Sequence, residues 1–434
     1  MGTLGNVALT QRMLVDRGYI YKGEHEGWYA VSDEAFYPAS QVREVSKNGE
    51  IYYESIETGT RVEWTTEVNY KFRLSAFQEP LLSWLEAHED AIQPRTMYDQ
   101  VLAEVRSGLN DLSVSRPRSR LHWGIRVPEN DDHTMYVWVD ALVNYLTGVG
   151  YPNAATAWPA DVHVVGKDIV RFHAVYWPAL LMAAGLPLPR TVLAHSHWTV
   201  EHAKMSKSRG NSVNPFEALC VYGVDTMRYF LMRIGGNLGT DADYSSALLE
   251  EHKRKFLQGQ LGNLLSRVLA PKIQARLADA GPMLARLPFT SADMPLLQAL
   301  TDLPATFDAY MTRYEPAKAI GAAFEVIGRT NEHVQHTAPW SAETPHDAVH
   351  RSVFLAIEAL RICGTLLEPV MPRAMATMLD VLQVPATERT WAALVLRDVV
   401  PLRTETTKIA PLFPRGAASV SYTHLRAHET RGNL

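Results

Sequence analysis

Cysteine is scarce in this chain: Cys220 and Cys363 are the only two among 434 residues. Two cysteines so far apart exclude a framework of disulfides and a zinc site built from several thiolates. So low a number fits a reducing compartment.

Long apolar runs are also missing. No stretch of about twenty apolar residues occurs, so no membrane span is expected. Residues 1–7 show neither a signal peptide nor an Arg-rich transit helix. The net charge is -5 with a pI of about 6.4. That charge argues against a general polyanion-binding surface but allows a local basic patch on an acidic body.

What is present is the composition of a globular protein, with 47% hydrophobic and 21% charged residues. The length allows two to four domains. The pattern predicts a helix over 9–18, short strands and turns over 19–70, and helix over 73–107 with a break at Pro94. In a second region, over 135–194, expected strands alternate with expected helices. Its segments are a β-rich run at 135–139, a helix at 140–146, a strand at 162–165, a helix through Met182 and a strand at 191–194.

Buried strands that alternate with helices predict a parallel, doubly wound α/β sheet. From 247 to 382 the apolar spacing is close to 3.6 residues, with prolines at the joints. This part predicts an all-α helix bundle.

The most specific motif is Lys204-Met205-Ser206-Lys207-Ser208, followed by Arg209-Gly210-Asn211. Two cations and two hydroxyls suit a polyphosphate whose charge is held during transfer and then released, since lysines are flexible point charges. The glycine allows a sharp turn. The alternative is a solvated basic loop, which a Lys-rich five-residue stretch taken alone favours.

A second run, Trp138-Val139-Asp140-Ala141-Leu142-Val143-Asn144-Tyr145, places Trp138, Ala141 and Tyr145 on roughly one face at the start of a helix. Two aromatics and a small residue form a suitable wall for a flexible apolar side chain, and thioether sulfur packs well against aromatics. Taken alone, this pattern favours the other interpretation, an aromatic stripe in the core.

A third run, from Gly166-Lys167-Asp168 to His173 and Trp177, leaves a strand and enters a helix. In an open α/β sheet, ligands bind just beyond the carboxyl ends of strands. Asp168 is therefore a candidate acceptor for a ribose hydroxyl or an ammonium group. The alternatives are that Asp168 caps the helix and that His173 is a packed, hydrogen-bonded residue.

These runs read WVDALxNYL, GKDIVxFHxxYWP and KMSKSRGN in that order, and together they resemble the methionyl-tRNA synthetases of class I. The resemblance extends from residue 9 to about 415. It includes an inserted segment at 18–38, its return at 111–125, and the helical-domain segments LGNLLSR at 261–267 and HTAPW at 336–340.

The resemblance implies roles for individual residues. The side chain of methionine would be enclosed by Trp138, Ala141, Tyr145, Ile169 and His173. ATP would be bound by Gly166, Asp168 and the loop residues Lys204, Met205, Ser206, Lys207 and Ser208, with Lys204 and Lys207 as catalytic cations. The CAU anticodon of tRNA(Met) would be read by Asn263, Arg267 and Trp340, residue types that supply edge hydrogen bonds and stacking. For Asn263 and Arg267 alone, a solvated helix face is the alternative.

The implied architecture is the second half of a class I (Rossmann-like) catalytic domain with its connective insertion, followed by an α-helical anticodon-binding bundle. The expected divisions are 1–18, the end of the first catalytic half; 19–132, the insertion; 133–245, the second half with its lysine loop; 246–415, the anticodon-binding domain; and 416–434, a tail that resembles a translated adapter and carries no function. The implied reaction is the ATP-dependent joining of methionine to tRNA(Met), with Mg-ATP as substrate.

Two departures from the family pattern stand out. No His-x-Gly-His occurs in the chain, so we expect a truncated fragment that lacks the first catalytic half and activates methionine poorly. The alternative function is then a non-catalytic tRNA-binding fragment. Ala30 and Asp33 occupy the positions of a zinc-binding Cys-x-x-Cys, so we expect no zinc and an insertion held by Trp28, Tyr29, Phe36 and Tyr37.

The zinc-free form resembles the mitochondrial-type enzymes, which implies the mitochondrial matrix, with the cytoplasm as the alternative. We also expect a monomer that does not enter membranes. Ligases for cysteine are excluded because they need thiolate-bound zinc. Those for valine, leucine and isoleucine are excluded because 19–132 is too short for their editing insertion.

Overall fold

The computed structural model describes residues 12–31, 35–37, 39–47, 50–56, 58–153, 157–205, 212–402 and 410–414. The chain forms two compact units, Met1–His195 and Ser196–Leu434. Each unit has its own hydrophobic core. The main cluster of buried apolar residues in each unit contains residues of that unit only. The predicted functional divisions are finer than this and stay a prediction.

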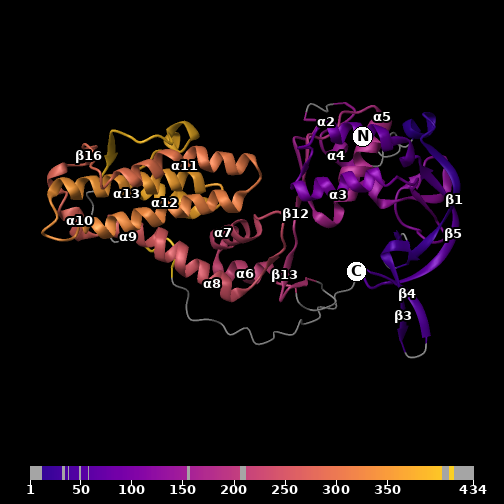
Figure 1. The fold of residues 1–434 in the computed structure, drawn as a ribbon, viewed down its shortest axis with the longest axis horizontal. Coiled ribbons are helices and arrows are strands. Elements are labelled where there is room, and N and C mark those ends of the chain that lie inside the picture. The colour runs from indigo at the N-terminus through magenta and orange to yellow at the C-terminus, as the bar shows by residue number, and fades with distance from the viewer. Residues whose placement is uncertain are drawn as a thin grey trace. The chain divides into compact units, whose positions relative to one another are not determined.

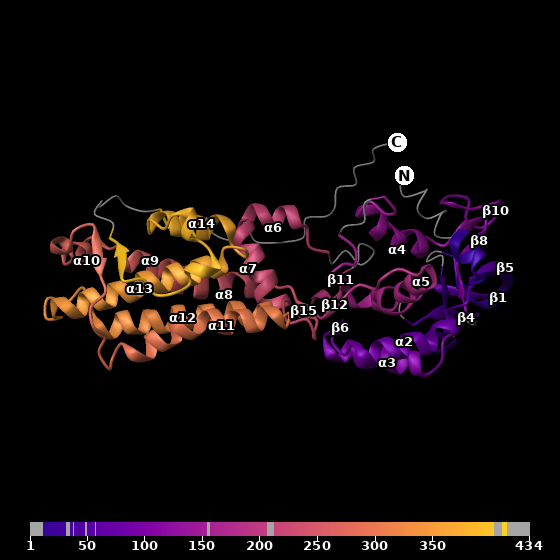
Figure 2. The same cartoon turned by 90° about the horizontal axis from the view of Figure 1, so that it is seen from above.

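The first unit contains a parallel sheet with strand order β11-β12-β6; Figure 1 labels β12, and Figure 2 labels all three strands. Its strands are β11 (Val162–Gly166), β12 (Thr191–His195) and β6 (Ile92–Gln93). The helices of this unit are α2 (Gln78–Ala87), α3 (Arg95–Arg106), α4 (Val137–Gly148) and α5 (Trp177–Ala184). The parallel pairing was predicted for β11 and β12, whereas β6 was not.

The first described helical residues, 12–16, agree with the predicted helix at the start of the chain. Gly18 follows with a φ of 74°, a left-handed conformation that glycine adopts without strain and that ends the helix. Arg17 donates from Nη1 to the carbonyl oxygen of Ala183, which ties this segment to α5.

The inserted segment forms an antiparallel sheet with strand order β2-β1-β5-β4-β3, as the short strands over 19–70 predict. The strands are β1 (Ile20–Ala30), β2 (Ala35–Tyr37), β3 (Val42–Lys47), β4 (Glu50–Ser55) and β5 (Arg61–Phe72), with β7 (Leu112–Ser113) pairing on β5. The return toward the parallel sheet carries a small sheet of β8 (Ser115–Pro117), β10 (Asn130–Met135) and β9 (Arg126–Val127). In Figure 1 the long strands β1 and β5 lie side by side.

The predicted β-rich run over 135–139 is wrong. Strand β10 ends at Met135, Tyr136 is extended, and α4 begins at Val137. The reason is the spacing of the apolar residues behind it, since the buried positions Val139, Leu142, Val143 and Leu146 recur every three to four residues and form one helix face.

The second unit begins with a small sheet and then becomes helical. The sheet has strands β13 (Trp198–Val200), β14 (Ala203–Lys204) and β15 (Ala242–Asp243). The helices α6 (Pro215–Tyr222) and α7 (Val224–Gly235) follow β14 along the chain. One continuous helical rod runs from 246 to 268, with a π-helical stretch η6 (Lys253–Gly262) between α8 (Ser246–His252) and α9 (Asn263–Val268).

The helix bundle predicted over 247–382 is confirmed, and its long helices pack side by side in Figures 1 and 2. Its further helices are α10 (Pro271–Ala275), α11 (Met294–Thr312), α12 (Pro316–Thr337), α13 (His346–Leu367) and α14 (Pro372–Val381). A two-stranded antiparallel sheet of β16 (Met283–Ala285) and β17 (Val399–Pro401), which was not predicted, packs on α13.

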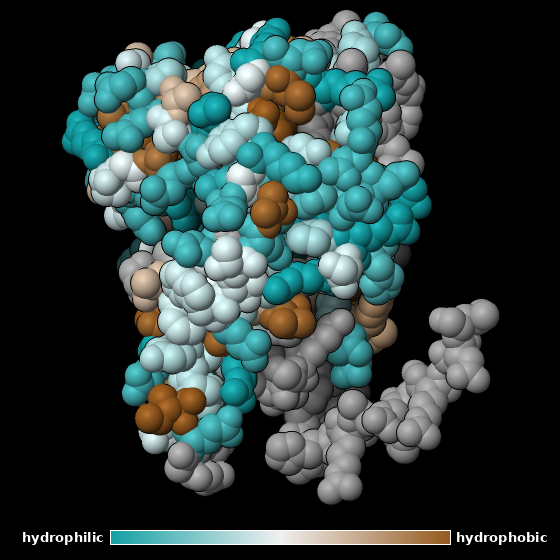
Figure 3. Space-filling view, turned by 90° about the vertical axis from the view of Figure 1, so that its right-hand side faces the viewer, coloured by the Kyte–Doolittle hydropathy of each residue, from teal (hydrophilic) through white to brown (hydrophobic). Residues whose placement is uncertain are grey.

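None of the described helices combines the length and the apolar character needed to cross a membrane. The face drawn in Figure 3 is mostly hydrophilic, and its hydrophobic residues appear as separate spots. Scattered exposed apolar residues are ordinary for a globular protein, whereas one contiguous patch would mark a docking surface.

Candidate functional site

Helix α4 has two faces, and the predicted pocket residues lie on the one that the core does not use. The core face consists of Val139, Leu142, Val143 and Leu146. Trp138 is half-buried, Ala141 is exposed, and the Tyr145 side chain is 37% exposed. An aromatic core stripe would be buried, so the exposure of this face favours a wall for a ligand.

His173 joins this face to the helix that follows β11. Its ring nitrogens lie 2.8 Å from the Tyr145 hydroxyl at Nε2 and 2.9 Å from the Ile169 carbonyl at Nδ1. A carbonyl only accepts, so we assign the proton to Nδ1 and an acceptor role to Nε2, to which Tyr145 donates. Burial lowers the pKa of His173, although the Ile169 carbonyl opposes this shift. The arrangement therefore holds a neutral imidazole.

The turn that carries His173 is π-helical, η4 (Phe172–Tyr176), a local widening that often occurs at functional sites. It places Phe172 against Trp138 with ring centroids 3.8 Å apart and planes at 12°. Trp138 also meets His173 edge-on at 5.9 Å. Phe172 was not among the predicted residues, although it directly precedes His173 in the motif.

His163 on β11 also belongs to this group and was not predicted from the sequence. Its ring lies 4.4 Å from that of Tyr145 and 6.1 Å from that of His173. Burial, and secondarily the neighbouring His173, lower the pKa of His163 to about 4. A histidine inside the apolar strand Val162–Val165 was the available signal, because buried polar residues in such strands need a reason.

Gly166 and Asp168 lie at the carboxyl ends of the parallel strands. Gly166 ends β11 and pairs in register with His195 at the end of β12. Asp168 is exposed within the 3-10 turn η3 (Lys167–Ile169), whose N-cap position is held by Gly166. Asp168 is therefore not the capping residue, and its position agrees with the usual location of ligands in α/β sheets.

The lysine motif begins on a tight hairpin of the second unit. Strands β13 and β14 are joined by Glu201 and His202, both with positive φ, as a type I′ turn requires. Asp243 holds this turn, since its Oδ1 accepts from Thr199 Oγ1 at 2.6 Å and from the His202 amide at 2.9 Å. These hydrogen bonds lower the pKa of Asp243.

The backbone of Lys204 ends β14, and Met205 follows half-buried. The Lys204 side chain and the remaining loop residues, Ser206, Lys207 and Ser208, lie outside the described residues. Their contacts stay predictions. The structure gives the anchored hairpin from which the loop departs.

The predicted anticodon residues come together in the helix bundle. The Arg267 guanidinium lies over the Trp340 ring, 4.7 Å from its centroid, in a cation–π contact. Asn263 is exposed one turn earlier on α9, directly after the π-helical stretch. Burial lowers the pKa of Arg267, and Trp340 packs half-buried on the bundle core. Arg267 and Trp340, 73 positions apart in sequence, thus form one surface.

Two amides on α12 hold this surface and were missed. Asn263 donates from Nδ2 to Asn331 Oδ1 at 3.3 Å, and Arg267 donates from Nη2 to Gln335 Oε1 at 2.7 Å. Asn331 in turn donates to the carbonyl oxygens of Gln260 and Ile327. The signal was the i,i+4 spacing of Asn331 and Gln335, which matches that of Asn263 and Arg267. The face is therefore organised rather than merely solvated.

Among the described residues, no group of three or more histidine, cysteine, aspartate or glutamate side chains is arranged to hold a metal ion. Asp33, one of the two residues on which the zinc-free prediction rests, lies outside the described residues. The zinc-free character of the insertion stays a prediction.

Comparisons with known proteins agree with both halves of this picture. The chain matches the family "tRNA synthetases class I (M)" over residues 6–269 and the "anticodon binding domain of methionyl tRNA ligase" over residues 287–408. The expectation of a truncated fragment is not supported by these matches, because the catalytic family is matched from residue 6 onward.

Among curated proteins, the chain is 45% identical to a probable mitochondrial methionine–tRNA ligase of Neurospora crassa, over 87% of this chain and 64% of that protein. It is 42% identical to the mitochondrial methionine–tRNA ligase of Mus musculus, over 96% of this chain and 75% of that protein. The chain thus spans somewhat less than two thirds of the first relative and three quarters of the second.

Among solved structures, the methionyl-tRNA synthetase of Mycobacterium tuberculosis bound by methionyl-adenylate superposes with a TM-score of 0.84 at 37% identity. The superposition covers 95% of this chain and 81% of that one. The family matches and the relatives agree with the two surfaces described above, on α4 and on the helix bundle. The chain belongs to the methionyl-tRNA synthetase family of class I aminoacyl-tRNA ligases.

Proposed function

We propose that the chain acts as a methionine–tRNA ligase. The methionine carboxylate attacks the α-phosphorus of Mg-ATP and pyrophosphate leaves. The terminal ribose hydroxyl of tRNA(Met) then takes the methionyl group. The observation that carries this proposal is the aromatic face of α4, which turns away from the core and meets a neutral His173. Positioning and charge stabilisation supply most of the catalysis in transfers of this kind.

The pocket suits a thioether side chain. Trp138 and Tyr145 present aromatic faces, and sulfur packs favourably against aromatic rings. Ile169 adds an apolar wall, while Ala141 leaves room between the two aromatics on the same helix face. A neutral, hydrogen-bonded His173 avoids placing a cation beside an apolar side chain. A cation there would cost desolvation free energy.

ATP is proposed to lie at the carboxyl ends of β11 and β12, with Gly166 near the adenosine and Asp168 near the substrate amine. Lys204 and Lys207 would stabilise the departing pyrophosphate, with Met205, Ser206 and Ser208 completing the loop. The anchored β13–β14 hairpin supports this assignment, because it fixes where the loop starts.

The CAU anticodon is proposed to be read by Asn263, Arg267 and Trp340. An exposed amide and a guanidinium offer edge hydrogen bonds, and the half-buried indole offers a stacking platform. Their hydrogen bonds to α12 preset both polar side chains before the tRNA arrives, which reduces the entropy lost on binding.

A second candidate function is tRNA binding without amino-acid activation. The specific observation is that the 434 residues contain no His-x-Gly-His, the signature that contacts the phosphates in class I enzymes. Without those imidazoles, stabilisation of the charge that develops at the α-phosphate should be weak. We expect this polypeptide alone to form methionyl-adenylate far more slowly than the mouse relative.

ATP–pyrophosphate exchange tests the first step, with methionine, valine, leucine, isoleucine and cysteine compared in parallel. Any exchange should depend on methionine, and exchange driven by another of these amino acids would overturn the substrate assignment. A rate equal to that of the mouse relative would show that other residues replace the missing signature. Fluorescence titration with tRNA(Met) tests the second function, and equal binding by Trp340→Ala would contradict the anticodon assignment.

The names of the relatives favour a mitochondrial location, which we propose is the matrix, with the cytoplasm as the alternative. A monomeric enzyme is proposed. Detection of a tagged chain in fractionated cells, and sedimentation of the purified protein, test these two points.

A further inference from the structure

The loop that carries Trp340 has an unusual backbone. It connects α12 to α13 over residues 338–345 and begins at Ala338, whose φ of 46° and ψ of 59° are left-handed. A non-glycine residue adopts this conformation only where its surroundings enforce it. The Thr344 hydroxyl contributes, since it lies 3.0 Å and 2.8 Å from the carbonyl oxygens of Thr337 and Ala338.

The stronger restraint comes from Arg276, the residue that follows α10. Its Nη1 donates to the carbonyl oxygens of Pro339, at 3.3 Å, and of Ser341, while Nη2 donates to the carbonyl oxygen of Thr344 at 2.6 Å. Two of these carbonyls belong to the residues on either side of Trp340. A planar guanidinium can satisfy several acceptors at once with little further loss of rotamer freedom.

Arg276 belongs to the same stretch of chain as Asn263 and Arg267. Helix α9 provides Asn263 and Arg267, and only two residues separate the end of α9 from the start of α10. The Ile273 side chain of α10 is buried in the bundle core. One short segment therefore provides both the guanidinium that stacks on Trp340 and the guanidinium that fixes the loop beneath it.

We propose that Arg276 is a positioning residue for anticodon recognition: it holds the Trp340 backbone so that the indole is presented as a preformed stacking surface. The inference rests on the proposed reading of the anticodon by Trp340. A base that stacks on a fixed indole does not have to order the loop, so affinity is gained without a new contact. Arg276 need not touch the RNA.

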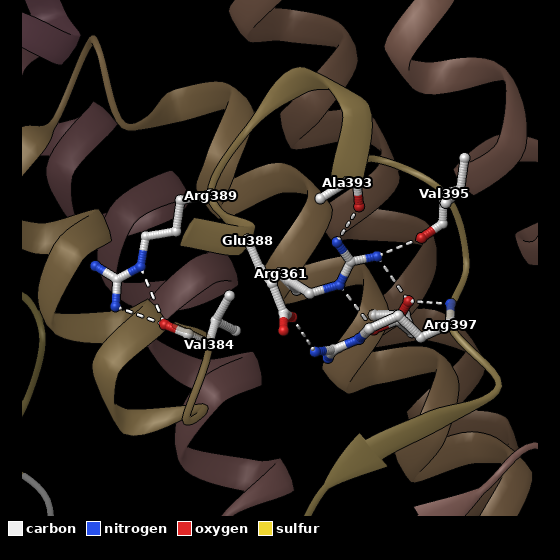
Figure 4. Close-up of polar contacts among 8 residues, drawn as sticks. Arg361, Val384, Glu388, Arg389, Ala393, Val395 and Arg397 are labelled. Carbon is white, nitrogen blue, oxygen red and sulfur yellow. Dashed lines mark hydrogen bonds and ion pairs between the residues drawn. The ribbon is translucent and has the colours of Figure 1, made fainter. Parts of the chain in front are cut away.

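The chain offers a matched control. Arg389 also holds a loop by its guanidinium, donating to the Val384 carbonyl oxygen from Nε at 3.1 Å and from Nη2 at 2.8 Å (Figure 4). That loop, 384–389, follows α14 and carries none of the anticodon candidates. Arg389→Ala therefore removes a similar arginine–carbonyl contact from the same unit at a different place.

The experiment uses the full chain and two transcripts of tRNA(Met), one with CAU and one with its first anticodon base replaced. Affinities of the parent chain, Arg276→Ala, Arg276→Lys, Trp340→Ala, Arg276→Ala/Trp340→Ala and Arg389→Ala are measured at one salt concentration. Arg276→Ala should weaken binding of the CAU transcript about tenfold, roughly 1.4 kcal/mol, and leave binding of the other transcript unchanged. Arg276→Lys should fall between, and Arg389→Ala should retain the preference.

In the Trp340→Ala background, Arg276→Ala should add nothing, because the surface that it positions is gone. Full retention of the CAU preference by Arg276→Ala, or an equal loss for both transcripts, would overturn the positioning role alone. If Trp340→Ala itself keeps the preference, both this role and the anticodon assignment fail.

A second readout needs no RNA and guards against simple unfolding. With 5-fluorotryptophan in the chain, the resonance of Trp340 is assigned from Trp340→Phe and then compared in Arg276→Ala and Arg389→Ala. Arg276→Ala should shift or broaden that resonance and leave the other nine tryptophans as they are. An unchanged Trp340 resonance in a folded Arg276→Ala chain would contradict the proposal.

Discussion

The residues around Tyr145 show how a ligand wall is kept neutral. His173 uses both ring nitrogens in hydrogen bonds, and His163 packs its ring against Tyr145 from β11. Burial lowers the pKa of both histidines, so the group carries no positive charge near neutral pH. An uncharged aromatic surface suits an apolar side chain, because no ion has to be desolvated when the ligand enters.

This neutrality predicts how stability depends on pH. The pKa of His163 is about 4 in the folded chain against 6.5 for a free imidazole. Between these values the unfolded chain binds a proton that the folded chain does not, so the free energy of unfolding falls as pH falls. Above pH 6.5 the imidazole is neutral in both states, and the free energy of unfolding keeps its full value. By about pH 4 the free energy of unfolding has fallen by at most about 3 kcal/mol through this group.

Urea unfolding followed by tryptophan fluorescence, repeated between pH 7 and pH 4.5, measures this slope. His163→Phe should flatten it in part, since His173 titrates in the same direction. His122→Gln, at an exposed histidine, serves as the control and should leave the slope unchanged. An equal slope for His163→Phe and the parent chain would show that His163 is not the group involved.

At the scale of elements, the inserted sheet contains a cluster of aromatic contacts. Trp28 on β1 meets Tyr53 at 4.3 Å and its cross-strand partner Trp64 at 5.5 Å between ring centroids. Tyr29 packs on Phe36 at 4.9 Å across the β1–β2 pair. The predicted packing of Trp28, Tyr29 and Phe36 is confirmed, and Tyr37 pairs with Trp28 in the register of β1 and β2. Tyr53 and Trp64 extend the cluster beyond the sequence prediction.

Trp28→Ala should destabilise the insertion by about 1–3 kcal/mol, because it removes two aromatic pairs together with buried apolar area. A chelator should leave the melting temperature of the parent chain unchanged, since no metal is expected there. Limited proteolysis within 19–72, together with thermal melts with and without EDTA, measures both effects. A melting temperature that EDTA lowers would contradict the zinc-free prediction, whatever the effect of Trp28→Ala.

The sequence predicted elements where the pattern is local, and it failed where a partner far along the chain decides. The α12 and α13 helices follow from the spacing of apolar residues close to 3.6. The parallel pairing of β11 with β12 follows from the alternation of buried strands with helices along the chain. Strand β6 has only two residues and becomes a strand only by pairing with β12. Its Ile92 is in register with Val192, which lies 100 residues later in the chain. No local pattern encodes such a strand.

The same reason explains what was missed at the sites. Motif residues such as His173 and Arg267 were found because they and their neighbours in the sequence match a known family motif. Their partners His163, Gln335 and Arg276 are placed by tertiary packing, and only the structure brings them together. Motif reasoning thus finds residues that contact substrates more readily than those that hold them in position.

At the scale of the whole molecule, each unit has a separate core, so we expect two unfolding transitions. The second unit contains a buried ion network that allows this to be tested (Figure 4). Glu358, fully buried on α13, accepts from Arg361 at 2.9 Å and 2.7 Å and from the Arg397 backbone and side chain, both at 3.0 Å. Arg361 also donates to the Ala393 and Val395 carbonyl oxygens, which attaches the chain after α14 to α13.

Glu358→Gln removes the negative charge and leaves two guanidinium groups without it, one of them buried. Removing one partner of a buried ion pair typically costs about 3–5 kcal/mol, so the second unit should unfold at distinctly lower denaturant. Seven of the ten tryptophans lie in the first unit, so fluorescence reports mainly on it: Trp28, Trp64, Trp84, Trp123, Trp138, Trp158 and Trp177. Helical circular dichroism reports mainly on the second unit, which holds the long helices.

The midpoint followed by circular dichroism should therefore move in Glu358→Gln while the midpoint followed by fluorescence stays. Arg329→Ala breaks the exposed pair of Arg329 with Glu325. It should change the free energy of unfolding of neither unit by more than about 1 kcal/mol. If both midpoints of Glu358→Gln move together, the two units unfold as one. The separate cores would then not be enough to make the two units unfold independently.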